Sequence, residues 1–311
     1  MSGTRGRSVP PAEIHDQASG LRRLLAERPG FCAIGLFGPD PALNALTGAS
    51  LAFALARRGD SVWVLDEAAP PANVATQLGL APRAGLADLG RSELGLLDAL
   101  ATGPGGVQVL AAQRSVAWLR EMGERRWLRL GESVAAQSPD WLLLAAPGDA
   151  ANSLAHAAPL KLLLLPAAKN RIAEAYATLK LAHQIQPDGQ WLVLRLNAGD
   201  PQQSAALFAS LADTARRFLE IAPVDLGAVP RDAKLELAAR SMRPILEVSP
   251  ASPAAAAFRA VVERLGEHAA LRPPRLELDF DAFWQRLGLI GRMLAPPSLD
   301  TPHVGPGRAY G

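Results

Sequence analysis

Nucleotide chemistry, if the chain has any, belongs to the loop that follows its first apolar run. That loop reads Gly38, Pro39, Asp40, Pro41, Ala42, Leu43, Asn44 and Ala45. A phosphate-binding loop of the form G-x-x-x-x-G-K-[ST] needs a second glycine for close backbone approach, a lysine for the β- and γ-phosphates and a hydroxyl for magnesium. Leu43, Asn44 and Ala45 stand at those three positions. The loop therefore lacks the side chains that hold phosphate and magnesium.

The backbone of this loop is also poorly suited to an anion. Pro39 and Pro41 have no N–H group to donate, and Asp40 places a carboxylate about where a phosphate would dock. Asp followed by Pro is typical of an N-cap and the first residue of a helix. We interpret the segment as a strand-to-helix turn in which Asp40 caps its own helix.

The remaining reactive residues suggest no other active site. Cys32 lies inside an apolar run, which favours a small buried hydrophobic residue and excludes a disulfide framework. A Gly-x-Ser-x-Gly nucleophile motif is absent, and most carboxylates fall on predicted helix surfaces. The histidines lack metal-ligand spacing; they are His15, His156, His183, His268 and His303. We therefore expect no catalytic residue, no metal and no cofactor.

The elements that must position these residues follow from hydrophobic patterning. Several of the short apolar runs are apolar on both faces, and segments long enough for crossover helices separate them, which predicts a mostly parallel sheet covered on both sides. The expected fold is therefore a doubly wound α/β domain. Predicted strands are 31–37, 61–66, 107–112, 140–146, 160–165, 190–197 and 223–229. Helix starts are marked by Asp40-Pro41, Asp200-Pro201 and Ser252-Pro253.

Composition excludes several classes of protein. The 311 residues are 49% hydrophobic, which is ample material for a core. Lys and Arg number 32 against 30 Asp and Glu, so we expect no nucleic-acid partner. No apolar run is long enough for a membrane span, and the first residues do not resemble a signal peptide. We expect a cytoplasmic protein, with peripheral contact at the inner membrane left open.

Four further segments, taken in their order and spacing, resemble one known family. The chain is similar to the MinD/ParA-type ATPases, and specifically to their flagellar branch (FlhG, also called FleN). The resemblance covers roughly residues 12–270 and implies a MinD-like, P-loop NTPase fold. The segments are 46–80, which contains V-L-D-E-A-A-P-P-A-N-V, then 82–112, 174–180 and 226–265.

Departures from the family pattern are concentrated at its catalytic positions. Aligned on Gly38, Pro39 replaces the signature lysine, Asn44 the phosphate lysine and Ala45 the magnesium threonine. Ala68 replaces the aspartate that activates water in active members of the family. Phosphoryl transfer depends almost wholly on such positioned charges, so we expect a protein that does not hydrolyse ATP.

The fourth strand departs in the same way, because Ala145 and Ala146 replace a magnesium-associated aspartate and a threonine. Two family positions persist as vestiges. Asp66 remains at the end of the second strand, where it also reads as a strand-end cap. Asn197 stands where the family has an adenine-contacting asparagine, although an asparagine that ends a strand is often only a turn residue.

The N-terminal segment carries a second part of the resemblance. Residues 16–22 read D-Q-A-S-G-L-R and match the D-Q-A-x-x-L-R motif by which flagellar members activate a partner GTPase, FlhF. An amphipathic helix is predicted over 14–26. It either docks on that partner or packs back on its own domain. The partner-binding residues implied are Asp16, Gln17, Ala18, Leu21 and Arg22.

The C-terminal segment contains one further amphipathic helix. Gly288 and Gly291 each lower its helix propensity by about 1 kcal/mol, and it has few basic residues. Relatives carry a membrane-targeting helix here, so its apolar face either meets a membrane or partner, or closes a groove of its own domain. The face comprises Phe280, Phe283, Trp284, Leu287, Ile290 and Leu294.

These observations predict three regions: a flexible N-terminus with its helix (1–29), a MinD-like domain (30–270) and a tail (271–311). We expect a catalytically silent regulator of flagellar number or placement that binds and activates a FlhF-type GTPase. The alternative is a nucleotide-dependent ATPase switch that cycles on and off the membrane. A pseudo-enzyme that serves another positioning system is a third reading.

Overall fold

The computed structural model describes residues 30–90, 94–148, 150–271 and 276–294. The described residues from Phe31 onward form one compact unit around an eight-stranded sheet with the order β3-β4-β2-β5-β1-β6-β7-β8. Every strand runs parallel to its neighbours except β3, which is antiparallel to β4. The strands are β1 (Cys32–Phe37), β2 (Val62–Asp66), β3 (Ala101–Thr102), β4 (Gln108–Ala111), β5 (Trp141–Ala145), β6 (Leu160–Pro166), β7 (Gln190–Ala198) and β8 (Val224–Pro230).

The seven strands that the apolar runs predict are all present, and the doubly wound fold is confirmed. β3 is an addition that hydrophobic patterning did not reveal, because two residues are too few to show a period. It pairs with β4 across the glycine-rich connector, where Gly105 and Gly106 adopt φ values of +69° and +82°. Glycine is the residue that takes such a backbone without strain.

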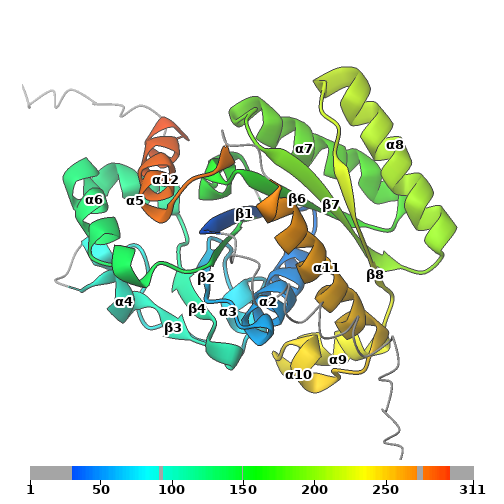
Figure 1. The fold of residues 1–311 in the computed structure, drawn as a ribbon, viewed down its shortest axis with the longest axis horizontal. Helices are drawn as coiled ribbons and strands as arrows, with labels where there is room; N and C mark the ends of the chain where they lie inside the picture. Colours follow the sequence, from blue (N-terminus) through cyan, green and yellow to red (C-terminus); the bar gives the residue numbers. More distant parts are fainter. Residues whose placement is uncertain (1–29, 91–93, 149, 272–275, 295–311) are drawn as a thin grey trace, which may run out of the picture. The chain divides into compact units, whose positions relative to one another are not determined.

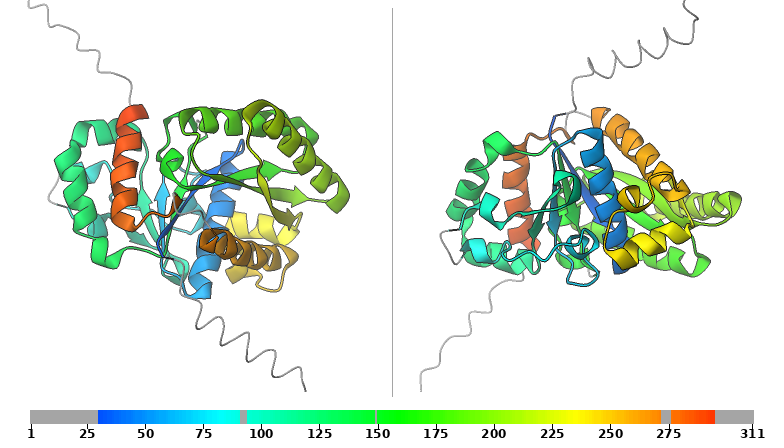
Figure 2. Two further views of the ribbon diagram at one scale, coloured as in Figure 1. Left: turned by 45° about the horizontal axis from the view of Figure 1, so that its top comes forward. Right: turned by 90° about the horizontal axis from the view of Figure 1, so that it is seen from below.

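Helices cover both faces of the sheet (Figures 1 and 2). One face is covered mainly by α2, α3 and α9 to α11, and the other by α4 to α8 and α12. The helices are α2 (Pro41–Arg58), α3 (Val74–Gln77), α4 (Leu96–Ala99), α5 (Ser115–Met122), α6 (Glu124–Glu132), α7 (Ile172–Ile185), α8 (Pro201–Leu219), α9 (Ala233–Ser241), α10 (Ile245–Val248), α11 (Pro253–Ala270) and α12 (Phe280–Leu294). A short 3₁₀ turn, η5 (Leu154–Ala157), precedes β6.

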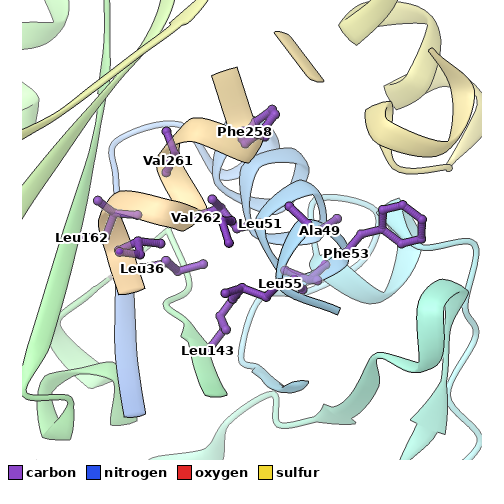
Figure 3. Packing of buried hydrophobic residues seen from close by; sticks show 14 of the residues in the cluster. Leu36, Ala49, Leu51, Phe53, Leu55, Leu143, Leu162, Phe258, Val261 and Val262 are labelled. Carbon is purple, nitrogen blue, oxygen red and sulfur yellow. The ribbon is translucent and has the colours of Figure 1, made fainter. Parts of the chain in front are cut away.

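Helix α2 is buried along most of its length and forms the centre of one core. Figure 3 shows side chains of α2 such as Leu51 and Leu55 meeting Leu36 of β1, Leu143 of β5 and Val262 of α11. Because α2 begins directly after the loop at residues 38–40, this packing holds that loop at the carboxyl end of β1.

The three predicted helix starts are observed. Asp40, Asp200 and Ser252 each accept a hydrogen bond from a backbone N–H of the first turn, and each is followed by proline at the first helical position. These caps satisfy donors that a helix N-terminus otherwise leaves open.

The C-terminal helix is a structural part of the domain, which corrects the interpretation of residues from 271 onward as an appendage. α12 packs on α5, α6 and η5 (Figure 1). Its apolar face belongs to the core, so the reading of that face as one offered to a membrane or partner is wrong for this structure. Phe280, Phe283, Trp284, Leu287 and Ile290 are buried, and Leu294 is partly buried against the same cluster.

A pair of tryptophans locks α12 against α6. The rings of Trp127 and Trp284 stack with centroids 4.0 Å apart, and each indole Nε1 donates to the backbone carbonyl of the other residue, at 2.9 and 2.8 Å. Gly131 and Gly288 lie beneath the rings, where a Cβ would collide with Trp284 and Trp127 respectively. Glycine therefore permits the close approach of the two helices.

Among the residues that the structure describes, every helix is too short or too polar to traverse a lipid bilayer.

Candidate functional site

In the loop between β1 and α2, the carboxylate of Asp40 occupies the position at which an anion would bind. Oδ1 of Asp40 accepts hydrogen bonds from the N–H groups of Ala42 and Leu43, both at 3.1 Å. The N–H of Asn44 donates to the carbonyl of Asp40 at 2.9 Å. The first amides of α2, which a phosphate would need, are thus already bonded within the loop.

Asn44 closes the loop from the inside. Its side chain is buried, and its Nδ2 donates to the carbonyl oxygen of Gly38 at 2.9 Å. A Cβ on Gly38 would collide with the Asn44 amide, so glycine at 38 gives the space that Asn44 fills. Ala45 follows, also buried and without a hydroxyl. Asn44 therefore stabilises the loop in the conformation that the structure shows.

A groove of about 540 Å³ lies beside this loop and brings together residues that are far apart in the sequence. Asn197, near the end of β7, lines it together with Asp40 and Leu43. Asn197 adopts a left-handed backbone with φ +55°, which asparagine tolerates better than most residues. The remaining lining residues come from α2, α3 and the β8–α9 region: Ala42, Leu46, Gln77, Arg231, Asp232, Leu235, Glu236 and Ala239.

Charge in the groove does not favour a nucleotide phosphate. Asp40, Asp232 and Glu236 supply three carboxylates, and Arg231 is the one basic residue among the described lining residues. Asp232 also accepts from the N–H groups of Lys234 and Ala254, at 2.8 and 3.1 Å, so it serves as a helix cap.

Asp66 is not among the residues that line this groove, and it has a structural partner. It is fully buried, and its Oδ2 accepts from the N–H of Ala75 in the first turn of α3 at 2.8 Å. Burial raises the pKa of Asp66 to about 6, while the hydrogen bonds from Ala75 and its neighbours act in the opposite direction. The surviving family aspartate thus anchors α3 to the end of β2.

Glu67 is a buried acid that the sequence analysis did not single out. Its carboxylate accepts from the hydroxyls of Ser115 and Ser153 and, at 3.0 Å, from the N–H of Leu154. Burial raises the pKa of Glu67 to about 7, against the lowering effect of these bonds. The cluster joins β2 to α5 and η5. In the sequence, Glu67 can be recognised as an acid directly after a buried strand. The family pattern, however, places aspartates at positions 66 and 68 and none at position 67.

Three further positions that the resemblance assigns to catalysis are occupied by alanine. Ala68, Ala145 and Ala146 are buried against the ends of the central strands. Within the described ranges, no group of three or more His, Cys, Asp or Glu side chains is placed to hold a metal ion. Asp16, Gln17, Ala18, Leu21 and Arg22 lie outside the described residues.

Comparison with solved structures defines the class. The fold matches cell division ATPase MinD of Pyrococcus furiosus with a TM-score of 0.57 at 19% identity, over 76% of this chain and 98% of that one. MinD of Pyrococcus horikoshii, solved with Mg-ADP, matches with a TM-score of 0.58 at 15% identity, over 78% of this chain and 99% of that one. A ParA family ATPase of Chlorobium tepidum matches with a TM-score of 0.57 at 15% identity, over 76% of this chain and 99% of that one. The fold is therefore that of the MinD/ParA ATPases.

A curated relative identifies the branch within this class. No protein-family model matches the chain. The antiactivator FleN of Pseudomonas aeruginosa is 32% identical over 243 residues, which cover 76% of this chain and 86% of the relative. The chain belongs to the FleN branch of the MinD/ParA family.

Proposed function

We propose that this protein is a regulatory FleN-type protein that acts through protein partners and does not hydrolyse ATP. Its FleN relative is named an antiactivator, which favours a regulatory role in flagellation for this chain as well. The observation that carries the loss of catalysis is the closure of the loop by Asp40 and Asn44.

The chemistry of phosphoryl transfer supports the loss. A γ-phosphate would have to displace the Asp40 carboxylate from the N–H groups of Ala42 and Leu43 and would then lie beside that carboxylate. The charges that stabilise the transition state are a lysine, a magnesium ion and its ligands. Asn44, Ala45 and Ala145 stand at the positions that the resemblance assigns to those groups, and none of the three side chains supplies such a charge.

The partner that we propose is a FlhF-type GTPase, bound through the D-Q-A-x-x-L-R motif at residues 16–22. This segment precedes β1 in the sequence and is separate from residues 38–45. Selection can therefore retain it after the ATP chemistry is lost. A helix this short is marginal alone and is expected to order on its partner, with Leu21 as the apolar anchor and Arg22 as a charge-assisted contact.

The test measures GTP hydrolysis by the FlhF-type GTPase of the same organism with and without the full chain. We expect the chain to raise the rate, and Leu21→Ala and Arg22→Ala each to weaken that effect. Arg28→Ala, which removes a basic residue of the same segment outside the motif, is the matched control and should behave as the parent. Unchanged GTP turnover at a molar excess of the chain would refute the proposed partner.

A further inference from the structure

A buried lysine and a partly buried arginine lie near each other at the amino end of β6 and β7, the edge of the sheet opposite the phosphate loop. Lys161 of β6 is fully buried, and its Nζ donates to the carbonyl of Gln186. Its ammonium lies 5.6 Å from the ring centroid of Trp191, the residue that pairs with it on β7. Arg286 reaches this edge from α12, where its Nε donates to the carbonyl of Ala157 at 2.8 Å.

Two buried N–H donors in this region have no hydrogen-bond acceptor among the described residues. Nη2 of Arg286 and Nε1 of Trp191 are both buried, and neither has a hydrogen-bond partner in the described part of the chain. A buried polar group without a partner is costly, and most such groups in proteins are satisfied by water, an ion or a ligand.

Open space adjoins the unused donors. A cavity of about 220 Å³ is lined by Arg286 together with Pro187, Asp188, Gly189 and Leu276. It shares Gly189 and Leu276 with a second cavity of about 330 Å³ that Trp191 lines. The smaller space holds about seven water volumes, which suits a small ion better than a drug-sized ligand.

The charge around the smaller cavity is positive on balance. Burial and repulsion from Arg286 together lower the pKa of Lys161 to about 7, although Asp188 acts in the opposite direction. Asp188 is exposed, and its Oδ2 already accepts from Nε2 of Gln186 at 3.1 Å. The two cations are therefore incompletely neutralised. An anion beside them would supply both the missing charge and the missing acceptor.

We propose that this cavity binds a small oxyanion, phosphate or carboxylate, through the free Nη2 of Arg286, with Lys161 supplying positive charge beneath it. A guanidinium group matches the geometry of either anion. Because Arg286 belongs to α12, the bound anion would also stabilise the docking of that helix on the domain. The anion site of this chain thus lies at the amino edge of the sheet, whereas the loop at the carboxyl edge is closed by its own side chains.

The test is isothermal titration of the full chain with inorganic phosphate and, separately, with acetate in chloride buffer of constant ionic strength. We expect saturable binding of at least one anion, weakened about tenfold or more by Arg286→Gln because a charge-assisted hydrogen bond is lost. Asp188→Asn removes the carboxylate that the described residues place on the rim and should tighten binding by about twofold to fivefold. Arg292→Gln, which removes a guanidinium from the same helix, is the matched control and should bind as the parent does.

A second variant covers the case in which Arg286→Gln does not fold. Lys161→Met keeps an unbranched apolar stem beneath Gly189 and removes the buried charge, so it should fold and bind the anion more weakly. Absence of saturable heat with both anions at millimolar concentration would overturn the proposal. Equal binding by the parent and Lys161→Met, or an equal loss in Arg292→Gln and Arg286→Gln, would also overturn it.

Discussion

Replacing Gly288 with alanine separates helix propensity from packing in α12. Glycine inside a helix costs about 1 kcal/mol relative to alanine, so propensity alone predicts that Gly288→Ala stabilises the protein. In the structure, a Cβ at this position would lie 2.5 Å from both Cδ1 and Nε1 of Trp127. Trp127 has little room to retreat, because it stacks on Trp284 and donates to its carbonyl.

The expected net change is destabilisation. Overpacking of a core typically costs about 1–3 kcal/mol, and weakening the Trp127 hydrogen bond adds about 1 kcal/mol. The gain in propensity offsets about 1 kcal/mol of this sum. We therefore expect the free energy of unfolding of Gly288→Ala to fall by about 1–3 kcal/mol.

The assay is equilibrium urea unfolding followed by tryptophan fluorescence, in which a lower midpoint with an unchanged slope reports lost stability. Gln285→Ala is the matched control, because Gln285 lies on the exposed side of the same helix and should change stability by no more than about 0.5 kcal/mol. A midpoint for Gly288→Ala equal to or above that of the parent would show that the two helices do not pack as closely as described.

Two further predictions concern the buried acid and the C-terminal helix. Between pH 4.5 and about 7 the unfolded chain loses the Glu67 proton while the native state retains it, so this residue lowers stability as pH rises, by about 3 kcal/mol in total. Glu67→Gln should remove that loss; a stability difference between variant and parent that stays constant from pH 4.5 to 8 in urea unfolding would contradict the shift. Truncation after Leu271 exposes a core to which α12 contributes five large buried side chains, at about 1.5–3 kcal/mol each, which is comparable to the whole stability of a typical domain. The truncated chain should therefore show no cooperative thermal transition by circular dichroism near that of the parent; an unchanged melting temperature would restore the appendage interpretation.

Seven of the eight described strands and the start of α2 were predictable because their causes are local. Apolar runs of strand length and an Asp-Pro pair carry enough information to place β1 and the Asp40 cap. The bond from Asn44 to Gly38 was not predictable, since the orientation of a side-chain amide depends on the folded loop. The sequence indicates that Asn44 cannot act as the phosphate lysine, but the structure is needed to show what it does instead.

The docking of α12 illustrates a different limit. Helical spacing shows that Phe283 and Trp284 share an apolar face, but the same spacing suits a membrane, a partner or the domain itself. Glycine at position 288 suggested a weak helix, because helix propensity takes no account of how the helix packs against other elements. Its role in the structure is contact with Trp127, a residue 161 positions away, and no local pattern encodes such a pair.

We propose that the loop at residues 38–45 is closed to phosphate by its own side chains. This closure is tested most directly by titrating the full chain with a fluorescent ATP analogue in the presence of magnesium while sedimentation is recorded. We predict no saturable binding and an unchanged sedimentation coefficient. Asn44→Lys should behave in the same way, because it restores only one of the missing groups and leaves Asp40 on the first amides of α2. Saturable binding at submillimolar concentration that shifts the parent chain toward a dimer would contradict the account and establish an ATP-dependent switch.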